Sequence, residues 1–242
     1  MKITELQKDL AATFRWAARL NMNEGVANHF SACVPGSSTD FYVNKAGIHF
    51  SRIKASDLIL VNKDNIEDLK TKPDIVDATA ISIHGTIHQK VPHAKCIFHV
   101  HSKYSTALSA LKDATLPPID QNTMRFFNRV SIYNEYGGMG FEDESIKMAS
   151  ALGNKQHMLL ANHGILTTGE TISEGFDALY YFEKSAETYL TALSANKELN
   201  IVSDEIAEKT AQEWSNYPSD LARAHLDQIR LILDKEEPDY KN

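Results

Sequence analysis

The segment at residues 96–102, Cys-Ile-Phe-His-Val-His-Ser, limits what this chain can fold into because it alternates as a strand with one apolar face. In an extended chain successive side chains point to opposite faces, so His99 and His101 share one face while Phe98 and Val100 enter an apolar layer. Neutral imidazole is the commonest nitrogen ligand of zinc and iron, and two imidazoles on one strand need little further ordering. The pair is a candidate metal site. About as often as it binds a metal, such a pair only places polar side chains on a half-buried face.

A second apolar run, Met-Leu-Leu-Ala-Asn-His-Gly at residues 158–164, ends abruptly at a histidine. This pattern is typical of a strand whose tip presents His163, with Gly164 allowing a tight turn just after it. Structural zinc sites are usually closed four-ligand cages rich in cysteine, whereas here Cys96 faces away from the histidines and Cys33 is distant in sequence. Three histidines with an open fourth position therefore indicate a catalytic metal site.

Composition excludes several classes of protein. The 242 residues carry a formal net charge of -7 and no basic cluster, which argues against nucleic acid as a partner. Two cysteines without regular spacing do not make a disulfide framework. The N-terminus lacks the pattern of a signal peptide, and no apolar run approaches about 18 residues, the length of a membrane span. We therefore expect a cytoplasmic protein without a membrane partner.

Periodicity predicts the order of helices and strands. Apolar residues at three- and four-residue spacing predict an amphipathic helix over residues 4–20, with Thr4 as its cap. Strands are expected at 28–34 and 41–44 around a Pro-Gly turn, with more β-rich chain at 45–50 and 59–62. The charged segment at 63–72 is expected to be a surface loop or a short edge excursion. Helices are expected at 77–90, 104–111, 142–152, 173–195 and 204–235, the last broken near Pro218.

Two further motifs need interpretation. His84 and His88 lie four residues apart on the helix expected at 77–90, but without an intervening glutamate they do not make a zinc-protease helix. Histidines in this position are more often hydrogen-bond partners in the core or behind the ligands, by roughly two to one. The loop at 136–140 reads Tyr-Gly-Gly-Met-Gly without a following Lys-Ser, which indicates a tight turn or a subunit contact rather than a phosphate site.

Together these motifs resemble the class II aldolase and adducin-head family, over residues of about 6 to 193. The resemblance is carried by six short segments, at 28–31, 46–47, 55–58, 83–88, 99–101 and 162–169. It implies a single three-layer α/β/α domain over residues 1–242, with a mostly antiparallel central sheet and C-terminal helices from about residue 203. It also implies a homotetramer with sites at subunit boundaries, and one divalent metal on His99, His101 and His163. Zinc is the first expectation, with iron and manganese as the other candidates.

The chain departs from the sugar-phosphate aldolases of this family at one position. Those enzymes carry a Ser-Ser-Glu segment whose glutamate acts as acid and base beside the metal, and the matching residue here is Ala80. Their two phosphate-contacting serines fall on Ala78 and Thr79. The motif at 83–88 and the Tyr-Gly-Gly loop instead resemble the adducin-like branch.

The resemblance gives a set of candidate site residues. Asn28 and Gly47 match positions that approach the phosphate, and their backbone amides could hold a carboxylate or another anion. We expect the substrate-binding residues to be Asn28, Ser31, Gly47 and Thr79. We expect the proton carrier that replaces the glutamate to be His84, His88 or Tyr136, with Asp77 as a further candidate.

Three functions are open on this basis. The first is a metal-dependent lyase that cleaves a carbon–carbon bond or releases carbon dioxide from a small oxo- or hydroxy-acid or a sugar-derived substrate. The second is a non-haem iron oxygenase of the same fold. The third is a non-catalytic, adducin-like interaction domain, which we expect less because the chain stops soon after Pro238 without a long basic tail. The partners expected are therefore a small-molecule substrate and further copies of this chain.

Overall fold

A seven-stranded sheet organises the computed structural model, which describes residues 3–139 and 143–242. The strand order is β3-β2-β1-β4-β7-β6-β5, and every neighbouring pair is antiparallel except β5 and β6. The predicted α/β fold with a mostly antiparallel sheet is thus confirmed. The strands are β1 (His29–Cys33), β2 (Phe41–Asn44), β3 (Leu58–Val61), β4 (Cys96–Val100), β5 (Val130–Tyr133), β6 (His157–Leu160) and β7 (Gly164–Gly169).

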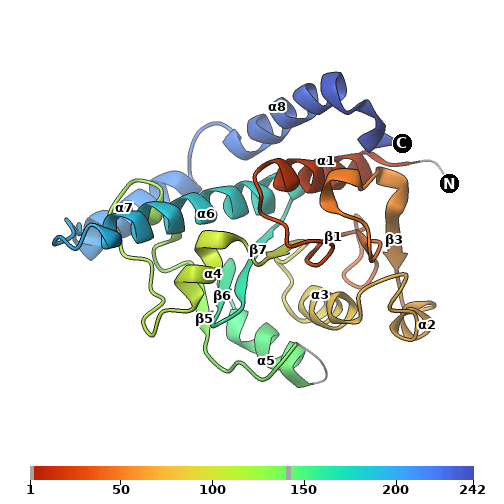
Figure 1. The fold of residues 1–242 in the computed structure, drawn as a ribbon, viewed down its shortest axis with the longest axis horizontal. Helices are drawn as coiled ribbons and strands as arrows, with labels where there is room; N and C mark the ends of the chain where they lie inside the picture. Colours follow the sequence, from red (N-terminus) through yellow and green to blue (C-terminus); the bar gives the residue numbers. More distant parts are fainter. Residues whose placement is uncertain (1–2, 140–142) are drawn as a thin grey trace.

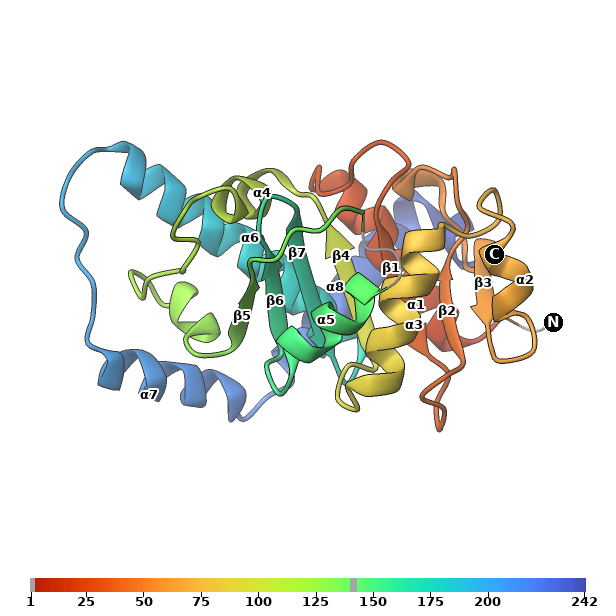
Figure 2. The ribbon, with the colours of Figure 1, turned by 90° about the horizontal axis from the view of Figure 1, so that it is seen from below.

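Helices cover both faces of this sheet (Figure 1). On one face lie α1 (Glu5–Arg19) and α6 (Ile172–Ser194), with α8 (Leu221–Glu236) packed against the outside of both. The opposite face is covered by α3 (Ala78–Lys90) and α5 (Asp143–Leu152), which Figure 2 shows in front of the strands. The remaining helices are α2 (Ile66–Lys70), α4 (Lys103–Ser109) and α7 (Asp204–Ser215), with 3-10 turns at Phe50–Arg52, Ala55–Asp57, Thr123–Phe126 and Pro238–Lys241.

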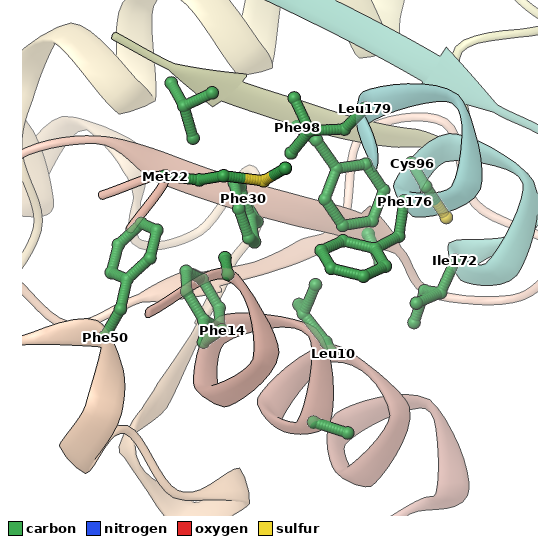
Figure 3. Close-up of a cluster of buried hydrophobic side chains, with 14 of the residues drawn as sticks. Leu10, Phe14, Met22, Phe30, Phe50, Cys96, Phe98, Ile172, Phe176 and Leu179 are labelled. Atoms are coloured by element: carbon green, nitrogen blue, oxygen red, sulfur yellow. The ribbon is translucent and has the colours of Figure 1, made fainter. Parts of the chain in front are cut away.

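The apolar layer between α1, α6 and the sheet is rich in phenylalanine (Figure 3). Phe14 of α1 stacks on Phe30 of β1 with ring centroids 4.6 Å apart, and Phe30 lies 4.8 Å from Phe98 of β4. Since side chains alternate along β1 and β4, packing Phe30 and Phe98 into this layer sends His29 and His99 to the other face of the sheet. The predicted apolar role of Phe98 is thereby confirmed.

Most of the predicted helix ends are confirmed. Thr4 caps α1 in a capping box with Gln7, and Asp77 caps α3 by accepting from the backbone N–H of Thr79. The predicted break near Pro218 falls between α7 and α8. In the part of the chain that the structure describes, no helix combines the length and apolar character needed to cross a membrane.

Two local predictions were wrong, and one strand was not predicted. The segment at 63–72, expected as a loop, contains the short helix α2 because Leu69 turns inward against the apolar cluster beneath β2 and β3. The segment at 45–50, expected to be β-rich, is a turn that leads into a 3-10 helix, whose Phe50 packs against Phe14. Strand β5 had no clear alternation in sequence and was not predicted. In the Tyr-Gly-Gly-Met-Gly loop, Gly140 lies outside the described residues.

The C-terminal segment is bound to the N-terminal helix. Arg15 of α1 donates to Glu237 and Asp239, each at 3.1 Å, and its side chain is only 6% exposed. Tyr240 is fully buried and donates its hydroxyl hydrogen to Asp234 of α8. These contacts close the outer side of α1 and stabilise the layer that supports β1 and β4.

Candidate metal centre

Three histidines converge at one edge of the central strands. His99 is the fourth residue of β4, His101 follows the end of this strand, and His163 lies in the turn between β6 and β7. One nitrogen from each ring lies within 4.8 Å of a nitrogen of both others, and the Nε2 atoms of His99 and His101 are 3.1 Å apart. The structure therefore brings together the three residues that the sequence proposed as ligands.

The turn that presents His163 depends on two neighbours in a way that the sequence did not reveal. Asn162, with a φ of 57°, supplies the left-handed residue of this turn, a role that had been predicted for Gly164. Gly164 is required for a different reason: a Cβ there would lie 2.4 Å from the carbonyl oxygen of Val100. Its missing side chain lets β7 approach β4 and carries His163 toward His99 and His101.

Hydrogen bonds fix which nitrogens of His99 and His101 are free. A carbonyl oxygen only accepts, so Nδ1 of His99 donates to Ile165 at 3.0 Å, and Nδ1 of His101 donates to the carboxylate of Glu24 at 2.6 Å. In neutral rings each Nε2 then carries a lone pair, and these two lone pairs face each other at 3.1 Å. Two facing acceptors repel unless a cation lies between them, so the donor set fits a metal ion.

Burial favours the neutral, ligating form of His99 and His163. Burial lowers the pKa of His99 well below its ordinary value, with the nearby His29 and His163 as further causes. Burial, followed by the charge of His101, lowers the pKa of His163 to about 4. Neutral imidazole is the form that binds metals, so neither ligand needs to lose a proton near neutral pH.

A second group of polar residues lies on the same face, behind the three ligands. Nδ1 of His29 lies 2.7 Å from Nε2 of His84, and the hydroxyl of Ser31 lies 2.5 Å from Nδ1 of His84 and 2.7 Å from Nε2 of His88. Nδ1 of His88 donates to the carbonyl oxygen of Ala94 at 2.7 Å. Burial lowers the pKa of His29 and of His88 to about 4, and that of His84 well below its ordinary value.

His29 and Glu24 are site residues that the sequence analysis missed. His29 is the direct antiparallel partner of His99, and their ring centroids are 5.2 Å apart. Alternation along the strand expected at 28–34 indicates that His29 and Ser31 face the same way. The register in which this strand pairs with β4 could not be predicted from the sequence. Glu24 lies in the connection between α1 and β1, where no periodicity marks it.

The proposed substrate residues lie at different distances from this cluster. The hydroxyl of Thr79 is 3.4 Å from Nε2 of His29, and Asn28, with a φ of 76°, accepts from the backbone N–H of Glu24. Ser31 is fully buried, whereas Gly47 lies in the turn after β2, and no contact found among the described residues joins it to the histidines.

Asn28 carries a further polar atom of interest. Its Nδ2 atom is buried, and it is one of only three buried side-chain N or O atoms without a partner in the described chain, the others being in His157 and Ser185. A buried N–H without an acceptor costs free energy, which a bound oxygen would remove.

The candidate proton carriers also differ in their surroundings. His84 and His88 are 0% and 2% exposed, and both nitrogens of each ring have hydrogen-bond partners, so neither offers a free nitrogen to a substrate. Tyr136 is 55% exposed and its ring lies 6.2 Å from that of His163. Ala80 is buried in the apolar cluster beneath β2 and supplies no polar group.

Comparison with known proteins identifies the family. The chain matches the model of the Class II Aldolase and Adducin N-terminal domain over residues 8–190. Among solved structures, an aldolase II superfamily protein from Pseudomonas syringae is 29% identical, with a TM-score of 0.86 over 98% of this chain and 95% of that one. An L-fuculose 1-phosphate aldolase from Glaciozyma antarctica is 28% identical, with a TM-score of 0.82 over 98% and 92%.

Curated relatives carry more than one activity. Decarboxylase NovR from Streptomyces niveus is 28% identical over 86% of this chain and 79% of its own length. A 4-hydroxy-3-prenylphenylpyruvate oxygenase/4-hydroxy-3-prenylbenzoate synthase from Streptomyces roseochromogenus is 31% identical over 67% of this chain and 58% of its own length. With the family model covering most of the chain and the same fold in the two solved structures, the chain belongs to the class II aldolase and adducin N-terminal domain family.

Proposed function

We propose that this protein is a metal-dependent carbon–carbon lyase that acts on a small oxo- or hydroxy-acid. The observation that carries the proposal is the convergence of His99, His101 and His163, whose hydrogen bonds leave two Nε2 lone pairs facing each other at 3.1 Å. Three neutral nitrogen ligands leave coordination positions for a substrate oxygen, as in catalytic metal sites. Zinc is the first candidate, with iron and manganese as the others.

A divalent metal on these ligands would supply Lewis acidity, drawing negative charge from the enolate that forms when the carbon–carbon bond breaks. The chain's own residues hold the ligands in place. Glu24 accepts from Nδ1 of His101, and the carbonyl of Ile165 accepts from Nδ1 of His99, so each ring keeps the tautomer that ligates through Nε2.

The polar groups beside the ligands suit a carboxylate. Asn28 Nδ2 is a buried donor without a partner, and it lies on the residue whose Oδ1 holds the backbone of Glu24. The Thr79 hydroxyl lies 3.4 Å from Nε2 of His29. A substrate carboxylate oxygen would satisfy the Asn28 donor and remove the cost of leaving it unpaired.

A sugar phosphate is a poorer fit. Ala78 and Thr79 stand where the sugar-phosphate aldolases have two serines, so at most one of the two hydroxyl groups remains, and Ala80 stands where they have the catalytic glutamate. One relative, 28% identical to this chain, is described as a decarboxylase, and loss of carbon dioxide from a metal-chelated oxo-acid needs no base before the bond breaks. These features favour an acid without a phosphate group.

The assembly belongs to the same proposal. Aldolase-fold relatives often oligomerise, and Tyr136 beside His163 is more than half exposed, so a neighbouring copy could cover this part of the site. We expect a homotetramer with contacts through the Gly137-Gly138 loop and the C-terminal helices. Light scattering at micromolar concentration measures this directly, and a monomer mass would contradict it.

The test of the proposal is metal content followed by a substrate screen. Purified protein should carry about one divalent metal per chain by elemental analysis, and His99→Ala should lose it while remaining folded. His93→Ala is the control, because His93 is bonded to the carbonyl of Lys155 outside the cluster. Full metal content in folded His99→Ala would show that the three histidines are not the ligands. The metal-loaded protein is then assayed with a panel of oxo- and hydroxy-acids.

An iron-dependent oxygenase is the second candidate, favoured by the relative that is described as a prenylphenylpyruvate oxygenase. The two functions differ in their use of oxygen. A lyase turns over equally in air and under nitrogen, whereas an oxygenase consumes oxygen only with iron bound. Oxygen uptake during turnover of an oxo-acid would therefore decide for the second candidate.

A further inference from the structure

We propose that His29 is the catalytic base of this site, and that Ser31, His84 and His88 are positioning residues that hold it with an unprotonated Nε2 toward the substrate. The inference rests on the proposed function and deepens it. His29 would take the proton-transfer role of the glutamate that is replaced by Ala80. A base at this place indicates a hydroxy-acid as the substrate class.

The hydrogen-bond chain has one direction because it starts at a carbonyl oxygen. The carbonyl of Ala94 only accepts, so Nδ1 of His88 carries a hydrogen, and in a neutral ring Nε2 of His88 must then accept. The hydroxyl of Ser31 has one hydrogen, which it donates to Nε2 of His88 at 2.7 Å. Ser31 can then only accept from His84, so Nδ1 of His84 is the donor at 2.5 Å.

The same reasoning extends to His29. With its hydrogen on Nδ1, neutral His84 has a lone pair on Nε2, and Nδ1 of His29 must donate to it at 2.7 Å. Nε2 of His29 is therefore without a hydrogen. The nearby hydroxyl of Thr79 is committed elsewhere, since it lies 2.6 Å from the Asp77 carboxylate and 3.4 Å from His29. The lone pair on Nε2 of His29 remains available.

The position of His29 suits proton transfer beside the ligands. It pairs directly with His99 across β1 and β4, and their ring centroids are 5.2 Å apart. It is nevertheless not a member of the group of three whose nitrogens lie within 4.8 Å of one another. Its Nε2 lies 3.4 Å from the hydroxyl of half-buried Thr79, whereas its Nδ1 is directed to fully buried His84.

The chemistry that such a base permits is retro-aldol cleavage of a hydroxy-acid. Nε2 of His29 takes the proton from the substrate hydroxyl, the O–H electrons form the new carbonyl bond, and the carbon–carbon bond electrons become the enolate. The proton on His29 then returns to the enolate carbon, which restores the neutral ring and balances the reaction without an oxidant or reductant. A positioned base of this kind typically contributes about 10²–10⁴-fold to the rate.

This assignment changes the roles expected of two histidines. His84 and His88 were candidates for the proton carrier, but both of their ring nitrogens are engaged within the chain. They contribute by fixing the tautomer of His29, as residues behind a catalytic group commonly do.

The first experiment measures tautomers directly and needs neither substrate nor metal. Long-range ¹H–¹⁵N correlation spectra of histidine-labelled protein distinguish a hydrogen on Nδ1 from one on Nε2, with each ring assigned by single replacements. We expect His29, His84 and His88 all to carry the hydrogen on Nδ1, both as purified and after removal of metal by a chelator. A hydrogen on Nε2 of His29 would overturn the proposal.

A variant then tests whether the chain sets the tautomer. Ser31→Ala removes the link in the middle, so His84 and His29 should become mixtures of tautomers while His88, still bonded to the Ala94 carbonyl, keeps its hydrogen on Nδ1. The matched control is Ser185→Ala, which removes another fully buried hydroxyl that has no partner. If His29 keeps a single tautomer in folded Ser31→Ala, the positioning role is refuted.

The third experiment separates base from ligand. His29→Asn keeps an N–H at the Nδ1 position for His84 but has nothing at the Nε2 position. It should keep its full metal content, and it should lower kcat on a hydroxy-acid substrate by about 10²–10⁴-fold with little change in KM. Loss of metal would make His29 a ligand and overturn the proposal, as would an unchanged kcat. If no hydroxy-acid is turned over by the wild type while the tautomers are as expected, the proposed function fails and the hydrogen-bond chain stands.

Discussion

Replacing Glu24 by glutamine should weaken metal binding about tenfold without unfolding the protein. Glu24 accepts from Nδ1 of His101 at 2.6 Å, which orients the ring and keeps its Nε2 free to bind a metal. Loss of such a partner typically costs about 10–100-fold in metal affinity. Because the Glu24 side chain is 62% exposed, water screens its charge, and we expect the lower end of this range, about 1.4 kcal/mol. Glutamine keeps the size and the accepting oxygen and removes only the charge.

The assay is a competition titration of metal-free protein against a chromophoric zinc chelator at pH 7.5. Glu67→Gln is the matched control, because it removes the same charge from an exposed ion pair with Lys70 on α2, far along the chain from the ligands. Wild type and Glu67→Gln should have the same zinc affinity. Glu24→Gln should release zinc at about tenfold lower chelator concentration. Zinc affinity of Glu24→Gln within about twofold of the control would refute the orienting role of this carboxylate.

Three other measurements test the structure. Gly164→Ala should destabilise the protein by about 1–3 kcal/mol and weaken metal binding, because the new Cβ would meet the carbonyl of Val100. Gly85→Ala in mid-helix should instead stabilise the protein by about 0.5–1 kcal/mol. Denaturant unfolding compares the two variants, and equal changes in the free energy of unfolding would contradict this. Burial lowers the pKa of His157 to about 3, so between the unfolded value of about 6.5 and about pH 3 the unfolded chain binds a proton that the folded chain does not. The free energy of unfolding therefore decreases as the pH is lowered through this range. His157→Leu should reduce this decrease by up to about 1.4 kcal/mol per pH unit, and parallel curves for wild type and variant would refute it. Because Ala80 supplies no carboxylate, the protein should turn over fuculose phosphate and ribulose phosphate poorly with zinc, manganese or iron. Rates within about tenfold of a class II aldolase control would show that phosphorylated sugars are substrates.

Local chemistry was readable from the sequence wherever it depends on neighbours along the chain. The cap at Thr4 and the start of a helix at Asp77 were predicted, because a helix end depends on residues within one turn. The shared face of His99 and His101 followed from strand alternation alone, and the turn at His163 followed from the end of an apolar run. The errors fell where packing decides, as in α2, whose single buried Leu69 gives too little periodicity to detect.

The tertiary structure decided which residues surround the three candidate ligands. His29 lies beside His99 only because β1 pairs with β4 in one register, and Glu24 reaches His101 across 77 residues of sequence. The roles of His84 and His88 likewise depend on Ser31 of β1 meeting the inner face of α3, which leaves their rings without a free nitrogen. The sequence alone established that His99 and His101, at the end of β4, point to one face of the sheet. Strand register and helix packing, which join residues far apart in sequence, decided which side chains orient those histidines and which nitrogen remains free for chemistry.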